Sequence, residues 1–176
     1  LREMEFNRLL SSAISAYGEP ELESNKIETQ NLEKQQTVNN KNYYLINSLD
    51  EIDKWIEEAE EVGEVAVDTE TTSLDPHQAD LVGISLCSKI GKACYIPVGH
   101  KSPKCLKKEA VIKKLKKILE DPSIKKIGQN IKFDFIVFYK CGITLSSMED
   151  TMLMSYVLDA GKNRHNMDTL SEIHLG

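Results

Sequence analysis

Residues 64–71 read EVAVDTET, a short segment in which small and β-branched apolar residues alternate with polar ones. This alternation is typical of a β-strand with one buried face. Successive strand residues project to opposite faces, so Asp68 and Glu70 leave the sheet on one side while Val65 and Val67 point to the other. The segment therefore predicts a core strand that delivers two carboxylates to one place.

The segments on either side of this strand alternate between strand and helix patterns. Residues 43–47 favour a strand, and residues 48–62 favour a helix with Ser48 as its N-cap and acidic residues in its first turns. Residues 80–88 and 93–98 favour the two strands of a hairpin. The remaining elements are a short strand pattern at 123–128 and helical patterns at 103–120, 130–140, 149–158 and 167–175. This order predicts an α/β fold with a mixed central sheet flanked by helices.

The first forty residues differ in composition from the rest. Apolar residues near the start are spaced for a short helix, so residues 1–17 are expected to form an N-terminal helical segment. Residues 18–41 are rich in Glu, Asn, Gln, Lys and Ser, which is the composition of a flexible linker. The main domain is then expected to span residues 42–176.

Bulk composition limits the class of protein. Of the 176 residues, 40% are apolar, which is enough to bury one core of ordinary size. The sequence contains no run of eighteen apolar residues and does not open on a signal-peptide pattern, so we expect a soluble, cytoplasmic protein without a membrane partner. The four cysteines and four histidines lack the spacing of a zinc site, and we expect structural or solvent-exposed roles for them.

The charge distribution is uneven. A formal net charge of −6 argues against a protein that binds nucleic acid by electrostatics alone. Residues 101–126 nevertheless hold ten lysines against three acidic residues. This run predicts either a local basic face or an ordinary solvated helix surface.

The carboxylates carry the chemistry that the sequence indicates. Two like charges at one strand end repel each other, and a hard cation such as Mg²⁺ or Mn²⁺ is the usual way to stabilise them. Asp134 lies inside the apolar segment IKFDFIVF, where an ionised carboxylate needs compensation, and Asn130 precedes it by four residues, one helical turn away. The alternatives are surface ion pairs for Asp68 and Glu70, and a lysine partner or a local hydrogen bond for Asp134.

Four segments, in this order along the chain, resemble one known family. They are LREMEFNRLL, VAVDTETTSLDPHQADLVGISL, GQNIKFD and EDTMLMSYVLDAGKNRHNMDTLSE. Together they are similar to the proofreading 3′-5′ exonuclease domains of the bacterial DNA polymerase I family, within the DEDD exonucleases of the RNase H-like superfamily. The resemblance covers residues 1–12 and 43–176 and implies an RNase H-like fold.

The resemblance also implies an activity and a site. Asp68 and Glu70 would bind a catalytic metal ion, with Asp68 shared between two Mg²⁺ or Mn²⁺ ions and Asp134 holding the second. The substrate would be a single-stranded or frayed DNA 3′ end, hydrolysed to nucleoside monophosphates. This domain would be part of a longer parent chain, and the polymerase region of that parent chain would be a partner.

The residues that would contact DNA are Thr69, Leu74, Gln129, Asn130 and Arg164. Leu74 would wedge against the terminal base, although plain core packing is an alternative for it, as is surface cover for Arg164.

One part of the family pattern is absent from the sequence. The third motif, Y-x-x-x-D or H-x-x-x-D, would supply a fourth carboxylate; Tyr156, for example, is followed four positions later by Ala160. We therefore expect a fragment, truncated at its C-terminus, whose own activity is weak or absent. The alternatives for the function are a ribonuclease D-like RNA exonuclease and a non-catalytic exonuclease-fold scaffold in a polymerase.

Overall fold

The computed structural model describes residues 7–18, 42–101 and 105–176. The chain divides into two units, 1–35 and 36–176, and each is described by itself. In the first unit the described residues form helix α1 (Asn7–Tyr17), within the expected N-terminal helical segment. The expected linker lies, from residue 19 onward, outside the described residues.

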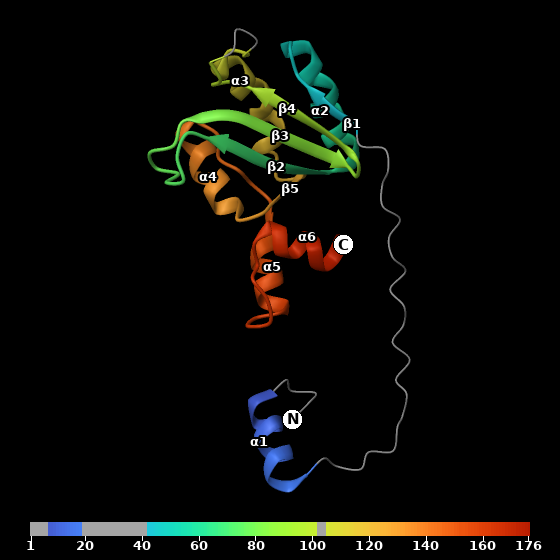
Figure 1. The fold of residues 1–176 in the computed structure, drawn as a ribbon. Coiled ribbons are helices and arrows are strands. Elements are labelled where there is room, and N and C mark those ends of the chain that lie inside the picture. The colour runs from blue at the N-terminus through green and yellow to red at the C-terminus, as the bar shows by residue number, and fades with distance from the viewer. Residues whose placement is uncertain (1–6, 19–41, 102–104) are drawn as a thin grey trace. The chain divides into compact units, whose positions relative to one another are not determined.

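The second unit is built on a mixed six-stranded sheet (Figure 1). Its order is β1-β4-β3-β2-β5-β6, in which β2, β3 and β4 pair antiparallel and the other neighbours pair parallel. The strands are β1 (Asn42–Leu45), β2 (Glu64–Thr71), β3 (Leu81–Lys89), β4 (Lys92–Pro97), β5 (Lys125–Gly128) and β6 (Met148–Asp150). The sequence predicted the first five, and the structure adds β6, whose three residues are too short to show a period.

Two helices, α2 (Leu49–Val62) and α3 (Lys108–Leu119), lie side by side against the sheet (Figure 1). Their apolar residues repeat at helical spacing and meet the sheet in one core cluster, in which Ile52, Leu115 and Ile118 are fully buried. The predicted helix at 103–120 was too long at its start, because α3 begins at Lys108 after an extended N-cap residue.

The ends of α2 follow from local sequence. The Ser48 hydroxyl donates to Glu51 and the Asn47 N–H donates to the same carboxylate, which satisfies polar groups at the helix start. At the other end, Gly63 has φ 79°, a left-handed conformation that glycine adopts without a steric penalty. The chain then turns directly into β2, which carries the paired carboxylates.

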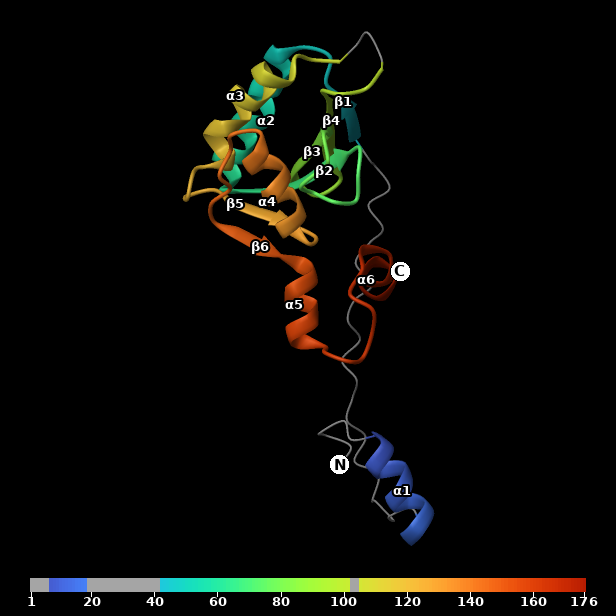
Figure 2. The same ribbon diagram turned by 90° about the vertical axis from the view of Figure 1, so that its left-hand side faces the viewer.

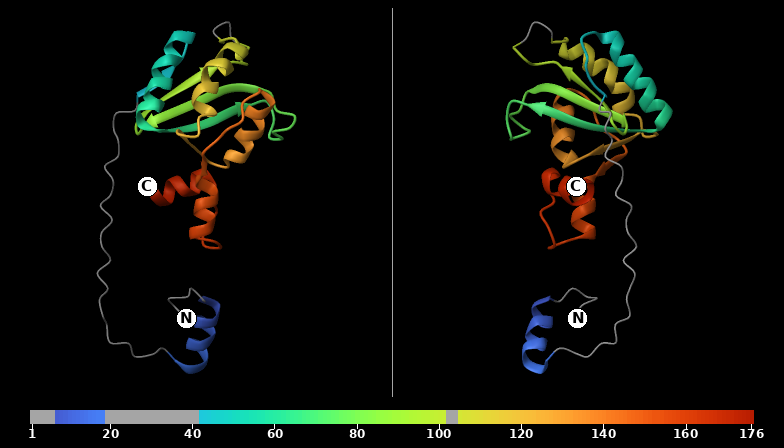
Figure 3. Two further views of the ribbon diagram at one scale, coloured as in Figure 1. Left: turned by 180° about the vertical axis from the view of Figure 1, so that it is seen from behind. Right: turned by 45° about the vertical axis from the view of Figure 1, so that its right-hand side comes forward.

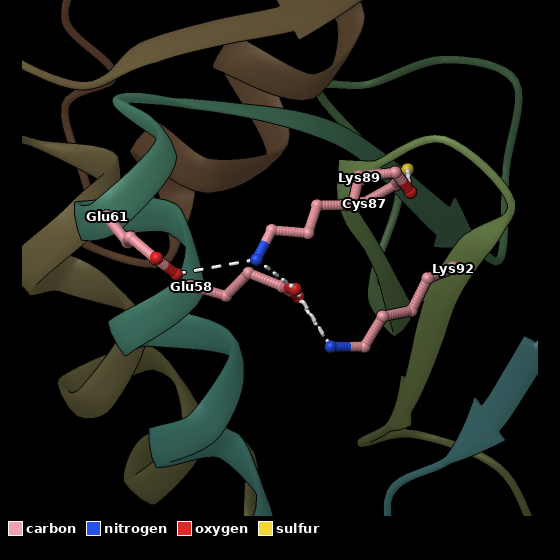
Figure 4. A network of polar contacts seen from close by, with 5 residues as sticks. All are labelled: Glu58, Glu61, Cys87, Lys89 and Lys92. Atoms are coloured by element: carbon pink, nitrogen blue, oxygen red, sulfur yellow. Dashed lines mark hydrogen bonds and ion pairs between the residues drawn. The ribbon is translucent and has the colours of Figure 1, made fainter.

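An ion-pair network joins α2 to the β3–β4 hairpin (Figure 4). The buried carboxylate of Glu58 is 2.9 Å from Lys92 Nζ and 3.3 Å from Lys89 Nζ, and Lys89 also contacts Glu61. Burial raises the pKa of Glu58, but the hydrogen bonds and charges of the two lysines outweigh it, so the net shift is downward. The network fixes the helix over the strands on which the site is built.

A second buried charge belongs to Lys126 on β5, which has no exposed surface. Its ammonium donates to the carbonyl oxygens of Asp121 and Ile124 at 2.6 Å and to that of Ile118 at 3.4 Å. Burial lowers its pKa. Because Ile118 belongs to the last turn of α3, this lysine ties the end of that helix to β5.

The last two helices, α5 (Thr151–Leu158) and α6 (Met167–Leu175), project from the β6 edge, away from α2 and α3 (Figures 2 and 3). Both had been predicted near these positions. Neither contains a buried residue. Among the described helices, none has the length and apolar content needed to cross a membrane.

Candidate active site

The end of β2 presents Asp68 and Glu70 on one face of the sheet. Both are exposed, while Thr69 between them is buried, as the two-residue period of a strand requires. Partial burial and then the charge of Glu70 raise the pKa of Asp68. The alternating burial confirms the predicted shared face of Asp68 and Glu70.

Asp134 comes to the same strand from α4 (Ile131–Lys140). Strand β5 pairs with β2 only as far as Ala66, and beyond that point the start of α4 lies beside β2. There the Thr69 N–H and hydroxyl donate to the same Asp134 oxygen, at 2.9 and 2.6 Å. The Asp134 carboxylate thus accepts the Thr69 N–H, which has no strand partner on this side of β2. The two hydrogen bonds from Thr69 fix the orientation of the carboxylate.

The residue Asp134 is only 3% exposed. Burial raises its pKa to about 6; the Thr69 hydrogen bonds oppose this, and the charge of Asp68 adds to it. The hydrogen bonds that oppose the effect of burial on the Asp134 pKa come from Thr69 and, at the helix start, from the backbone of Asp134 itself, and not from a lysine. The three carboxylates therefore form one coupled group, with Asp68 influenced by Glu70 and Asp134 influenced by Asp68.

The donor set of this group suits a hard divalent cation, because all three side chains offer carboxylate oxygens. Within the described ranges, no three His, Cys, Asp or Glu side chains converge closely enough in this conformation to enclose a metal ion. Asp68 and Glu70 are exposed and have room to rotate toward a cation, whereas Asp134 is held by Thr69.

The structure places the other predicted residues as follows. Leu74 is 97% exposed, so its alternative as a core residue is wrong, and Arg164 is also exposed. Gln129 bridges two segments, donating to the carbonyl oxygen of His165 at 2.7 Å and accepting from the Thr151 hydroxyl at 2.6 Å.

Asn130 requires a correction. We expected it on the same helical face as Asp134, but α4 begins at Ile131, and Asn130 is a left-handed residue with φ 57° just before the helix. Its N–H donates to the Asp150 carboxylate at 3.0 Å. Asn and Asp adopt this conformation more readily than other non-glycine residues, because their short side chains can bond locally.

Sequence reasoning missed two contributions to the site. The dual donation from Thr69 to Asp134 joins residues 65 positions apart, and no local pattern reveals such a pair. Asp150 accepts from Asn130 and from two N–H groups at the start of α5, linking both helix starts. The sequence did not show this N-cap role, because the helical pattern was expected to begin at residue 149, which places Asp150 inside the helix and not at its start.

Comparison with known proteins assigns the class. Residues 43–176 match the family described as 3′-5′ exonuclease. The chain therefore belongs to this exonuclease family, as the resemblance in its motifs predicted. The fold is the RNase H-like α/β fold expected from the sequence.

Individual relatives agree with this class. The DNA polymerase I of Rhizobium leguminosarum is 42% identical over 155 residues, which cover 76% of this chain but only 15% of that protein. The structure of Brucella melitensis NrnC with bound Mg²⁺ is similar with a TM-score of 0.56 at 27% identity, covering 75% of this chain and 60% of that one. Escherichia coli RNase D, an exoribonuclease, shares the fold at 22% identity with a TM-score of 0.59, covering 75% of this chain and 33% of that one.

Proposed function

We propose that this chain is the 3′-5′ exonuclease domain of a longer DNA polymerase I and removes nucleotides from DNA 3′ ends as a proofreading activity in the cytoplasm. The observation that carries the proposal is geometric: Asp68 and Glu70 lie on one face of β2, on either side of Thr69, and Thr69 holds the buried Asp134 by two hydrogen bonds. The chain belongs to the exonuclease family. The substrate would be a single-stranded or frayed 3′ end, because such an end has already lost the base pairing that would otherwise have to be broken. The polymerase region of the parent chain would be its covalent partner.

The three carboxylates would hold Mg²⁺ or Mn²⁺, two ions in a complete site, with Asp68 shared and Asp134 on the second. Such ions, when bound, lower the pKa of a water molecule and stabilise charge on the phosphate and the leaving 3′ oxygen. The chain's own contribution is orientation: Thr69 aims the Asp134 carboxylate, and β2 sets the spacing of Asp68 and Glu70. With its pKa near 6, Asp134 is ionised at neutral pH and available as a ligand.

The remaining predicted contacts would position the DNA strand. Leu74, almost fully exposed after β2, would wedge against the terminal base, and Gln129, Asn130 and Arg164 would contact the strand. The hydroxyl and N–H of Thr69 are both used by Asp134, so a DNA contact at Thr69 would involve its carbonyl or methyl group.

Substitution of one shared ligand tests the function. We expect Asp68→Ala in the full-length parent to lower single-stranded DNA hydrolysis by about a thousandfold or more, since groups that act as a catalytic unit fail together. The melting temperature should not fall, because the substitution relieves repulsion with Glu70 and Asp134. Glu64→Ala, an exposed acid at the other end of the same strand, is the matched control and should keep full activity. Retained hydrolysis by Asp68→Ala would refute the assignment.

An RNA exonuclease is the second candidate, favoured by the similarity to RNase D. Hydrolysis rates of the parent on DNA and RNA oligonucleotides of one sequence separate the two. We expect DNA to be the better substrate, and a preference for RNA would overturn that part of the proposal.

A non-catalytic scaffold would retain the fold without binding metal. We expect Mn²⁺ to bind this chain weakly through Asp68, Glu70 and Asp134, measured by water-proton relaxation, and Asp134→Asn to weaken binding. Absence of binding by the full-length parent at millimolar Mn²⁺ would favour the scaffold.

A further inference from the structure

The strands β1, β4, β3 and β2 place a row of side chains beside the carboxylates. Residues directly paired across neighbouring strands project to the same face. The register pairs Leu45 with Tyr95, Tyr95 with Ser85, and Ser85 with Asp68. Each of these four is exposed or half-buried, so this part of the face is open. The row therefore leads from the edge strand β1 directly to the candidate active site.

A shallow depression of about 430 Å³ follows this row. It is lined mainly by side chains of β1, β3 and β4 that carry aromatic or small groups. These include Tyr43, Leu45, Ser85, Ala93 and Tyr95. Its surface combines aromatic rings with hydroxyl groups and contains no acidic side chain, although it borders on Asp68. Such a surface suits a nucleotide, which has a flat apolar base and polar sugar and phosphate groups.

The Tyr95 ring lies directly on Gly83, the residue paired with Glu70. A Cβ atom at Gly83 would come within 1.8 Å of the Tyr95 hydroxyl oxygen and 2.2 Å of Cζ, so only glycine leaves room for the ring. The hydroxyl end of Tyr95 is thus one strand away from Glu70. The charge of Glu70 contributes, after burial, to the raised pKa of Tyr95, in agreement with this proximity.

The Tyr95 hydroxyl is held by His100. Its oxygen lies 2.6 Å from His100 Nε2, and the two rings meet edge to face with their centroids 5.7 Å apart. The backbone before His100 is fixed, because the Gly99 N–H donates to the Val82 carbonyl at 2.9 Å. Since a tyrosine hydroxyl has one donor and two acceptor positions, the contact with His100 leaves capacity for a second partner.

We propose that Tyr95 contacts the 3′-terminal nucleotide of the bound strand and that His100 is a positioning residue acting through Tyr95. The hydroxyl would hydrogen-bond to the sugar or phosphate, while the ring supports the nucleotide beside Glu70. This inference rests on the proposed function of the carboxylates. It extends the site across the sheet from β2 to β4. It also gives a role to a tyrosine and a histidine that no sequence motif indicated.

The test is Tyr95→Phe in the full-length parent, which keeps the ring on Gly83 and removes the hydroxyl. We expect KM for a single-stranded DNA oligonucleotide to rise about three- to tenfold, the range for one hydrogen bond, with kcat changed by less than about twofold. Tyr139→Phe, the same change at an exposed tyrosine of α4, is the matched control and should change neither parameter. An unchanged KM in Tyr95→Phe overturns the proposal.

A double substitution tests His100. His100→Ala should raise KM to a similar extent, and the double variant with Tyr95→Phe should be no worse than Tyr95→Phe alone, because the two residues act through one contact. Additive effects would overturn the positioning role. Melting temperatures of the variants check that the fold is intact.

A measurement on the unsubstituted protein covers the case in which a variant fails to fold. Thymidine 5′-monophosphate added with Mg²⁺ should shift the NMR signals of the Tyr95 ring and leave those of Tyr139 unchanged, and no shift at Tyr95 overturns the proposal. Asp68→Ala distinguishes a failure of the proposed function from a failure of the present inference. If it retains hydrolysis, the proposed function fails, whereas if it abolishes hydrolysis and Tyr95→Phe leaves KM unchanged, only the present inference fails.

Discussion

Helices α4 and α5 are both rich in apolar residues, but they differ in how far these residues are buried. In α4, Ile131, Val137 and Phe138 are buried against neighbouring strands. In α5, no residue is buried, and Val157 and Leu158 are among the most exposed apolar side chains of the described residues. Between the two helices lies an apolar groove of about 780 Å³. The difference shows that apolar composition alone does not bury a helix, which also needs a surface to pack against.

The largest effect should come from α4. Phe138→Ala removes a fully buried ring and leaves a cavity, so we expect the free energy of unfolding to fall by about 3–5 kcal/mol. Urea unfolding followed by circular dichroism measures it. A loss below about 1 kcal/mol would mean that α4 is packed no better than α5 and would break the comparison.

The next effect concerns the buried charge of α4. The pKa of Asp134 is raised in the folded state to about 6, so the folded protein binds more protons than the unfolded chain and loses stability as pH rises from about 4 to 6. Asp134→Asn does not titrate. Without divalent metal it should therefore be more stable than the unsubstituted protein above pH 6, by up to about 3 kcal/mol. Thermal melts in EDTA from pH 4 to pH 8 measure the difference, and equal curves would contradict it.

A smaller effect should come from the ion-pair network on α2. The pKa of Glu58 is lowered in the folded state, so its contribution is present above about pH 4.5 and is lost as pH falls through the lower folded-state value. Glu58→Gln should cost about 1–2 kcal/mol at pH 7. Breaking a buried pair can cost more, but Lys89 and Lys92 are 49% and 40% exposed and can turn to water. A cost that does not change between pH 7 and pH 3 would show that the effect is packing and not charge.

The smallest effect should come from α5. Leu158→Ala changes a side chain that is 79% exposed, so we expect a change within about 0.5 kcal/mol, measured by the same urea unfolding as for Phe138→Ala. A loss of 2 kcal/mol or more in this chain would show that Leu158 is covered in solution, which would erase the contrast between the two helices.

Much of this fold was predictable from local pattern. The alternation in residues 64–71 gave the strand and the common face of Asp68 and Glu70, and both were confirmed. The helix at 167–175 was also found at the predicted bounds. What could not be predicted was short or depended on distant partners: β6 has three residues, and the apolar helix α4 is buried only in part, since Tyr139 is 64% exposed.

The site shows the same division. The carboxylates could be identified from the sequence, because an ionised carboxylate in an apolar segment needs a compensating partner. The predicted helical face shared by Asn130 and Asp134 failed, because a left-handed residue ends the loop before the helix begins. The role of Tyr95 could not be predicted from the sequence. Its place beside Glu70 depends on the pairing of three strands and on Gly83, which has no side chain to occupy the space of the Tyr95 ring.

The two hydrogen bonds from Thr69 to Asp134 have a mechanical consequence. They make the helix that carries one carboxylate and the strand that carries the other two move as a single part. A sliding or tilting of α4 would have to break both bonds before it changed the separation of the acids. Thr69 therefore limits how far the separation of the carboxylates can change. Substitutions on the outer surface of α4 should leave that separation unchanged.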